Sequence, residues 1–257
     1  MKKGFTGSTL KIIAMVAMLI DHIGAVIFAR ILMATGVSGL DQTNTDAVMD
    51  WMAINADVFG TYTICRMIGR IAFPIFCFLL VEGFIHTGNA KKYAIRLFAF
   101  ALISEIPFDL AFKSEVLEFG SQNVFFTLAI GFVTLIAYKK VEEKEFQNKF
   151  TKILCQILVG MVGMFVAQIL MTDYSALGVL VIVMFYVLRE NRFYQIASGG
   201  ILFLENMSAL FAFLPILAYN GKRGMNVKWA FYIFYPAHLL VLYAICHFLG
   251  LSAIPAI

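Results

Sequence analysis

The stretch LKIIAMVAMLIDHIGAVIF, from Leu10 to Phe28, is as long and as apolar as one membrane-spanning helix, which takes roughly 20 residues. Asp21 and His22 nevertheless lie side by side near its centre. A charged group at that depth costs at least about 2.5–3.5 kcal/mol, so such residues usually face a bundle interior or an aqueous cavity. The pair is therefore the first candidate for a function.

The composition extends the membrane interpretation to the whole chain. Of its 257 residues, 61% are hydrophobic and 14% are charged, whereas an ordinary soluble domain is about half apolar and about a quarter charged. The net charge of +4 does not point to nucleic acid. The cysteines are scattered and none pairs with histidine at zinc-ligand spacing, so no metal is predicted. The basic start, MKKGFTGSTLK, precedes a full span without a small-residue cleavage site, which indicates a retained first helix.

We predict an all-α fold, a polytopic membrane bundle of about nine helices (eight to ten) that forms one domain over residues 1–257. The clearest predicted spans are Leu10–Met33, Tyr62–His86, Ala94–Phe112, Asn123–Tyr138, Ile153–Met171, Ala176–Leu188 and Trp229–Leu249. The segment 193–219 has basic residues at both ends, so we expect two short helices that break near Glu205 and Asn206. A single crossing is the alternative.

The connecting segments differ in charge, and this difference predicts the orientation. Basic residues gather in every second connection, whereas the first loop holds four aspartates and no Lys or Arg. These basic residues are Lys2, Lys3, Lys11, Lys91, Lys92, Lys139, Lys152, Arg189, Arg192, Lys222, Arg223 and Lys228. By the positive-inside rule, the protein lies in the cell membrane with a cytoplasmic N-terminus, and nine spans place the C-terminus outside.

Two predicted spans carry opposite charges at similar depth. Arg66 and Arg70 lie one helical turn apart on the second span, and Glu105 and Asp109 do so on the third. Because an unpaired buried charge is costly, we expect these arginines to pair with these carboxylates. A structural ion-pair network is the alternative to a functional one. Pro74 has no N–H, so it frees the carbonyl of Arg70 inside the second span.

His22 is the predicted general base, since a neutral histidine in a half-apolar site is suited to that task. Asp21 is a second catalytic candidate, but adjacent helical residues point about 100° apart. We therefore expect Glu105 or Asp109 to hold the ring of His22. This pattern predicts a base-catalysed transfer to a hydroxyl or an amine. A structurally satisfied core histidine is the alternative.

The last span begins KWAFYIFYPAHLLVLY and carries Tyr232, Tyr235 and His238. Tyrosines with polar tips near a helix end are typical of an interfacial aromatic belt. The alternative is that these three residues belong to a ligand site.

Several long stretches resemble the TraX family, in order along nearly the whole chain. They are LKIIAMVAMLIDHIGAVIF, GRIAFPIFCFLLVEGFIHTGN, RLFAFALISEIPFDLAF, NVFFTLAIGF, YNGKRG and FYIFYPAHLLVLY. The family is named after a conjugation-associated protein that acetylates the N-terminus of pilin. Its layout is similar to that of the type 3 acyltransferases, in which a catalytic histidine ends the first apolar helix in an LR…H arrangement. Lys11 and His22 stand in the corresponding places here, and lysine keeps the charge of arginine but loses its bidentate fork.

The resemblance implies that acetyl-CoA is the acyl donor on the cytoplasmic side and that the acceptor arrives from outside. The residues then predicted to hold the donor are Lys11, Lys91, Lys92, Lys222, Arg223, Lys228, Tyr232, Tyr235 and His238. Ordinary positive-inside charge is the alternative for the basic members. At the reacting centre, His22 would deprotonate the acceptor, and Arg70 or Asn123 would stabilise the oxyanion.

The predicted function is a membrane-embedded acetyltransferase that moves an acetyl group to an amine or hydroxyl of an exported peptide, pilin or glycan. A secondary transporter is the alternative, with the intramembrane ion pairs as proton relays. Related internal halves would favour a transporter, and the sequence shows none. A non-catalytic scaffold would leave the cost of the buried charges unexplained. The residues do not name the acceptor.

Overall fold

The computed structural model describes residues 4–41, 43–226 and 228–256. Within these ranges the chain is helical and forms no strand, and extended pairing is limited to two isolated bridges, Phe5 with Tyr219 and Gln122 with Thr172. The all-α prediction is confirmed for this part of the chain.

The first predicted span is one continuous helical rod that changes its pitch in the middle. Its segments are α1 (Gly7–His22), the π-helical η1 (Ile23–Phe28) and α2 (Ala29–Ala34). The rod begins where the side chain of Thr6 accepts a hydrogen bond from the N–H of Thr9 at 3.2 Å. The π-helical segment starts directly after His22, and such segments are frequent at functional sites.

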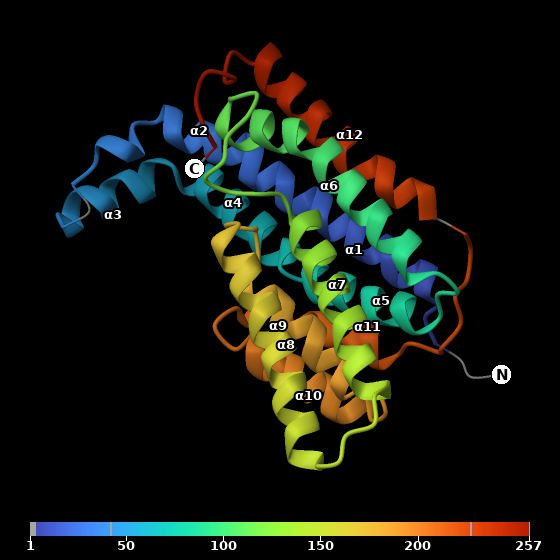
Figure 1. Cartoon of the computed structure of the whole chain (residues 1–257). Helices are drawn as coiled ribbons and strands as arrows, with labels where there is room; N and C mark the ends of the chain where they lie inside the picture. The colour runs from blue at the N-terminus through green and yellow to red at the C-terminus, as the bar shows by residue number, and fades with distance from the viewer. Residues whose placement is uncertain (1–3, 42, 227, 257) are drawn as a thin grey trace.

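The second predicted span is broken near its proline. From the end of the first rod to the end of this span, the chain forms η2 (Val37–Gly39), α3 (Thr45–Ile54), α4 (Ala56–Gly69) and α5 (Ala72–Ile85). The break lies at Arg70 and Ile71, where Pro74 cannot donate a hydrogen bond to the carbonyl of Arg70. In Figure 1, α3 projects away from the other helices.

Four helices follow: α6 (Ala90–Lys113), α7 (Val124–Glu143), α8 (Lys149–Ile169) and the shorter α9 (Ser175–Val187). Three of them begin at an asparagine whose side chain accepts a backbone N–H of the first turn. These caps are Asn89, Asn123 and Asn148. Asparagine is among the strongest N-cap residues, so the starts of these helices follow from local sequence.

The segment 193–219 forms two short helical pieces, as predicted. Its elements are α10 (Arg192–Leu202), the 3-10 segment η3 (Met207–Ala212) and α11 (Phe213–Leu217), followed by the last helix, α12 (Lys228–Phe248). Residues 203–206 separate the two pieces, which includes the predicted break at Glu205 and Asn206.

Five helical rods of the described chain are long and apolar enough to cross a membrane. They are Gly7–Ala34, Ala56–Ile85, Val124–Glu143, Lys149–Ile169 and Trp229–Phe248. The predicted count of about nine spans is therefore not confirmed. The 13 residues of α9 reach about 20 Å, whereas the hydrocarbon core is about 30 Å thick, and α10 and α11 are shorter still.

The helices are arranged around α1, α5 and α7 (Figure 1). α1 packs against α4 and α5, while α12 packs along α6 and also contacts α1. On the other side, α7 contacts α6, α8 and α9, and α5 contacts α9. The first and last helices of the chain are therefore neighbours, which matters for the site described below.

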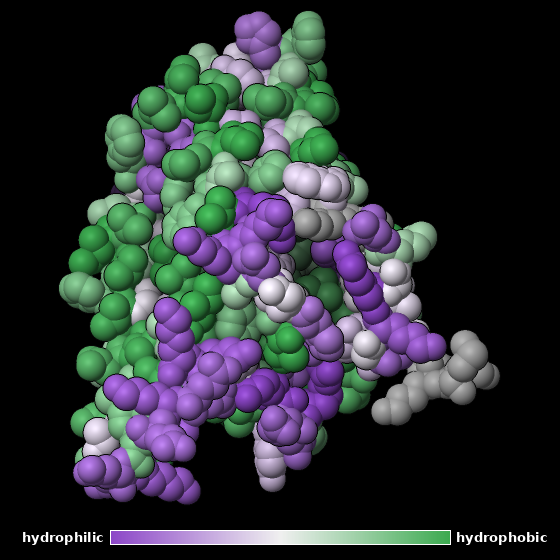
Figure 2. Space-filling model, turned by 45° about the vertical axis from the view of Figure 1, so that its right-hand side comes forward, coloured by the Kyte–Doolittle hydropathy of each residue, from purple (hydrophilic) through white to green (hydrophobic). Residues whose placement is uncertain are grey.

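One end of the bundle collects the basic connections, and we call it the basic end. The N-terminal segment pairs there with the loop before α12, through Phe5 N–H to Ala218 O at 2.8 Å and Gly7 N–H to Lys222 O at 2.8 Å. Figure 2 shows the side that carries the N-terminus: hydrophilic residues gather around its lower part and around a central hollow, and hydrophobic residues cover the upper part.

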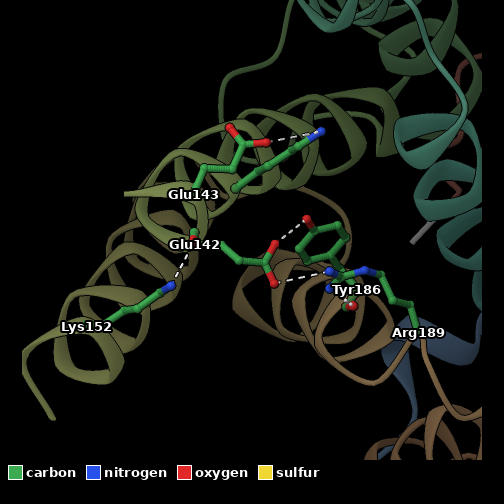
Figure 3. A network of polar contacts seen from close by, with 6 residues as sticks. Glu142, Glu143, Lys152, Tyr186 and Arg189 are labelled. Carbon is green, nitrogen blue, oxygen red and sulfur yellow. Dashed lines mark hydrogen bonds and ion pairs between the residues drawn. The ribbon is translucent and has the colours of Figure 1, made fainter. Parts of the chain in front are cut away.

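A polar network ties α7, α8 and α9 together at the basic end (Figure 3). The carboxylate of Glu142 accepts hydrogen bonds from the hydroxyl of Tyr186 at 2.7 Å and from the guanidinium of Arg189 at 3.1 Å. The backbone carbonyl of Glu142 accepts from the ammonium of Lys152 at 2.6 Å. The charged loop between α7 and α8 is thus anchored at its two ends.

Candidate active site

His22 lines a cavity of about 370 Å³ toward the end opposite the basic end, which we call the His22 cavity. Its walls come from α1 and η1, from α4, from the C-terminal end of α6 and from the turn between α8 and α9. Besides His22, the polar and charged side chains of the wall are Asp21, Tyr62, Arg66, Arg70, Lys113, Ser121, Thr172, Asp173 and Tyr174.

The ring of His22 is joined to the ring of His238, which α12 supplies. Nδ1 of His22 lies 2.6 Å from Nε2 of His238. The two rings are parallel within 2°, and their centres are 4.9 Å apart. The distance between the ring centres exceeds the distance between the two nitrogens by about the width of one ring. The two rings therefore meet edge to edge and lie in a common plane. This is the geometry of a direct hydrogen bond between two imidazoles.

The partner of His238 decides which nitrogen carries each proton. Nδ1 of His238 lies 2.7 Å from the carbonyl oxygen of Phe234, one turn earlier on α12. A carbonyl only accepts, so Nδ1 of His238 carries the hydrogen and Nε2 of a neutral His238 accepts. Nδ1 of His22 must then donate to it. The remaining nitrogen of His22, Nε2, is left with a free lone pair, and it has no hydrogen-bond partner among the described residues.

The predicted orienters of His22 are therefore wrong, because His238 holds the ring in place of Glu105 or Asp109. His238 was predicted as a donor-binding residue, and the structure places it beside His22 instead. The two histidines are 216 residues apart in sequence, and no local pattern signals their contact. The ring of Phe112 completes the surroundings of His22, at 5.5 Å between centres and nearly perpendicular.

Asp21 turns away from His22 and forms an ion pair with Arg66. The Oδ2 of Asp21 accepts from Nη1 of Arg66 at 2.6 Å. The predicted pairing of Arg66 with Glu105 or Asp109 is wrong for this reason: α4 packs against α1, and the nearest carboxylate is the one on α1. Both side chains are mostly buried, with 25% of Arg66 and 17% of Asp21 exposed. The pair forms one wall of the His22 cavity.

Two glycines allow α4 to approach α1 and η1 closely near this ion pair. A Cβ on Gly69 would lie 2.0 Å from Oδ1 of Asp21, and a Cβ on Gly24 would lie 2.6 Å from Cβ of Cys65. Neither position tolerates a side chain without movement of its neighbour. The close approach therefore depends on glycine at these two positions, because glycine has no side chain.

Arg70, Asp173 and Tyr174 add a second group of polar side chains to the cavity. Arg70 lies at the break between α4 and α5, beside Tyr174, and has no carboxylate within ion-pair distance in the described chain. Asp173 is accessible from the cavity, yet burial by the surrounding protein, followed by the charge of Asp21, raises its pKa to about 6. Asp173 and Tyr174 were not among the predicted site residues, because they occupy a short turn.

Three predicted catalytic residues lie outside the wall of the His22 cavity. The side-chain amide of Asn123 donates to Glu105 and to the carbonyl of Ala101, at 2.8 Å for the latter, and its oxygen caps α7. Asp109 is buried and accepts the N–H of Glu118 at 3.0 Å. These contacts join α6 to the chain before α7. A catalytic role for Glu105, Asp109 and Asn123 stays a prediction, and the proposal below does not use it.

A second cavity, of about 540 Å³, lies at the basic end, and we call it the basic cavity. Of the predicted donor-binding residues, Lys11, Arg223 and Tyr232 line it. The exposed side chains of Lys91, Lys92 and Lys222 are not part of its wall. The side chain of Lys228 lies outside the described part of the structure. The cavity is also lined by His86 and Arg96, which the sequence analysis did not single out.

A layer of buried aromatic side chains separates the two cavities. Tyr232 belongs to the wall of the basic cavity and stacks on Phe125, with ring centres 6.0 Å apart. Phe125 meets Tyr235 edge to face at 5.1 Å, and Tyr235 meets the ring of His22 at 6.0 Å. Phe125 and Tyr235 are 0% and 1% exposed. Tyr235, predicted as a donor-binding residue, is thus the boundary between the cavities.

No group of three or more His, Cys, Asp or Glu with metal-binding arrangement occurs among the described residues. The His22 cavity instead contains His22, which is bonded to His238, the ion pair of Asp21 with Arg66, and Arg70, which has no carboxylate within ion-pair distance among the described residues. This set can accept a proton and stabilise a developing negative charge.

Comparison with known proteins adds relationships over nearly the full length. A family model described as "TraX protein" matches residues 6–246. The "Probable fimbrial assembly protein FimC, serogroup H1" of Dichelobacter nodosus is 26% identical over 269 residues, which cover 93% of this chain and 94% of that protein. The "Uncharacterized protein RP591" of Rickettsia prowazekii (strain Madrid E) is 22% identical over 183 residues, which cover 71% of this chain and 56% of that protein. No solved structure matches.

Proposed function

Because this chain belongs to the TraX family, we propose that it is a membrane-embedded acetyltransferase that uses acetyl-CoA to modify an amine or hydroxyl. The acceptor is part of an exported peptide, pilin or glycan. The family is linked to pilin acetylation, and one relative carries the name of a fimbrial assembly protein, which favours pilin among these acceptors.

The observation that carries the proposal is the chain of hydrogen bonds from His22 through His238 to the carbonyl of Phe234. It leaves Nε2 of His22 as a base in a cavity. As this nitrogen takes a proton from the acceptor, the hydrogen bond from Nδ1 to His238 stabilises the imidazolium. An orienting group acts in this way on the histidine of a catalytic triad.

His22 can account for every proton that moves in the acetyl transfer. The acceptor nitrogen or oxygen attacks the thioester carbonyl, and His22 takes its proton. The bond between the acyl carbon and sulfur then breaks, and His22 returns the proton to the leaving thiolate. Arg70 is the candidate for stabilising the oxyanion, because it lines the same cavity and has no acidic partner within ion-pair distance in the described chain.

The proposal assigns one cavity to each substrate. The donor enters from the basic end, which the positive-inside rule makes cytoplasmic, and the acceptor enters the His22 cavity from the other side of the cell membrane. The acetyl-bearing arm must then pass the aromatic layer at Phe125 and Tyr235, so these side chains have to move during turnover.

The test is a thiol-release assay on the purified protein in detergent, with acetyl-CoA and amine or hydroxyl acceptors. His22→Ala should lower kcat by about 10²–10⁴-fold, the range of a lost general base. His247→Ala is the matched control, since His247 is exposed near the end of α12, and it should leave kcat unchanged. Full transfer by a folded His22→Ala variant would overturn the proposal.

A further inference from the structure

Arg96 is an arginine inside the bundle that has no acidic partner among the described residues. It lies on α6, is half-buried and forms part of the wall of the basic cavity. In the described chain no carboxylate lies within ion-pair distance of it, and its Nε is buried without a hydrogen-bond partner. A buried donor that stays unsatisfied is costly, so the position calls for an acceptor.

Two other partly buried arginines are, by contrast, paired with acids. Arg66 has Asp21 at 2.6 Å, and Arg189 has Glu142 at 3.1 Å. Arg96 instead lies over the ring of Tyr93, at 5.3 Å from its centre, and beside Tyr232. Aromatic neighbours position a guanidinium without neutralising it. The positive charge of Arg96 therefore remains available in the cavity.

Two further cations from other parts of the chain line the same cavity. Lys11 comes from the first helix, over the ring of Phe231 at 5.4 Å, and Arg223 comes from the loop before α12. The carboxylate of the wall is Glu82, and Arg192 approaches it at 3.9 Å. The cavity thus has a surplus of positive charge, and its volume is in the range of small-molecule sites.

We propose that Arg96 binds a phosphate group of an organic phosphate that occupies the basic cavity. This inference rests on the proposed function, in which that ligand is acetyl-CoA and the phosphates are those of its nucleotide end. A guanidinium can donate two parallel hydrogen bonds to one phosphate, one of them from Nε. Lys11 and Arg223 add charge without this geometry, or from an exposed position.

The position of Arg96 fits the direction in which the donor has to extend. Arg96 lies beside Tyr232, and His238 lies six positions after Tyr232 on α12. This distance is about 9 Å along the helix. A phosphate held at Arg96 would direct the rest of the ligand along α12 toward the aromatic layer and the histidine pair.

The experiment measures binding by calorimetry to the full-length protein in lipid-free detergent. The probes are coenzyme A, inorganic pyrophosphate, pantetheine (which lacks the phosphates) and a short-chain phosphatidylglycerol. Arg96→Gln should weaken binding of coenzyme A and of pyrophosphate at least about tenfold and leave pantetheine unchanged. Lys149→Gln removes one exposed charge at the basic end and should change none of the four. If Arg96→Gln does not fold, Arg96→Lys should show a smaller loss of the same kind.

Coenzyme A bound equally well by Arg96→Gln and the wild type would overturn the inference. A loss confined to phosphatidylglycerol would also overturn it, because the phosphate would then belong to a lipid headgroup. If the wild type binds pyrophosphate through Arg96 but neither binds coenzyme A nor transfers acetyl groups, the phosphate site stands and the proposed function fails.

Discussion

Nδ1 of His22 and Nε2 of His238 lie 2.6 Å apart in rings that are parallel within 2°, which joins the first helix of the chain to the last. In a neutral pair the contact leaves the other nitrogen of His22 unprotonated, and it predicts a positioning role for His238. His238 is 6% exposed and also bonded to the carbonyl of Phe234, so its own ring is fixed.

Replacing His238 should therefore impair the chemical step rather than binding. We expect His238→Phe to lower kcat at least about tenfold. The reason is that Nδ1 of His22 loses its hydrogen-bond acceptor, so the tautomer of the His22 ring is no longer fixed. The KM values for donor and acceptor should stay near those of the wild type. His238→Gln offers an amide oxygen as acceptor and should recover part of kcat. Equal losses in both variants, or a change in KM alone, would contradict the positioning role.

The close contact of Gly69 with Asp21 predicts the effect of one methyl group. In Gly69→Ala the new Cβ would lie 2.0 Å from Oδ1 of Asp21, so the ion pair with Arg66 must shift. We expect a loss of about 1–3 kcal/mol, as for other overpacked sites, measured as a lower Tm in detergent.

Gly60→Ala is the control for this prediction, since it lies on the same helix with no atom within 4 Å of the added Cβ. It should leave Tm unchanged or raise it slightly, because alanine favours a helix. Gly69→Ala should cost less stability in an Asp21→Ala background than in the wild type, because the clash is then absent. If it costs the same in both backgrounds, the clash with Asp21 is not the cause.

Features encoded locally could be predicted from the sequence. The apolar run around His22 predicted the first rod, Pro74 predicted that the carbonyl of Arg70 loses its helical partner, and the break inside 193–219 was predicted near Glu205 and Asn206. Each of these depends on composition or on backbone chemistry within one helical turn. The number of spans did not follow, since apolar segments as short as α9 satisfy a composition rule without being long enough to cross.

The partners inside the bundle could not be predicted, because they depend on which helices pack together. Arg66 has an acid on α1 rather than on α6, although the charges on α6 lay at a suitable depth. Asp173 reaches the cavity through a turn whose sequence carries no signal. Arg30 and Arg96 offered a usable signal, a lone cation within or beside an apolar span, and that signal was overlooked.

Arg30 stabilises the π-helical segment that follows His22 and the last residues of the chain. Its side chain is 0% exposed and donates to the carbonyls of Val26 at 3.1 Å, Ala111 at 2.6 Å and Ile254 at 2.7 Å. These carbonyls belong to three separate parts of the fold. We expect Arg30→Met to lower the stability by at least about 2 kcal/mol, because buried acceptors lose their donors.

Arg30→Lys keeps the charge but not the fork, so its Tm should fall between those of the wild type and Arg30→Met. Lys149→Met, at an exposed position of α8, should unfold at the wild-type temperature. Thermal unfolding of the four proteins in one detergent checks the order. A wild-type Tm for Arg30→Met would mean that water satisfies these carbonyls instead.

Asp173 makes the stability of the protein depend on pH in a defined direction. Burial, and then the charge of Asp21, raises its pKa to about 6 from 3.8, against the opposing charges of Arg66 and Arg70. Between about pH 4 and about pH 6 the folded chain therefore holds a proton that the unfolded chain has released. The contribution of this group to stability is present at the acidic end of that interval and is lost as the pH rises through 6.

Asp173→Asn removes this ionisation, so the Tm of the variant minus that of the wild type should increase from about pH 4 to about pH 6 and then level off. Asp41→Asn is the control: hydrogen bonds from Thr43 lower the pKa of Asp41, so this carboxyl is ionised at least as fully in the folded chain as in the unfolded chain over the same interval. Its difference curve should not rise with pH. A curve for Asp173→Asn that falls with pH would mean that Arg66 and Arg70 outweigh burial and hold Asp173 ionised. The His22 cavity would then contain a second carboxylate paired to arginine, and Arg70 would no longer be available to an oxyanion.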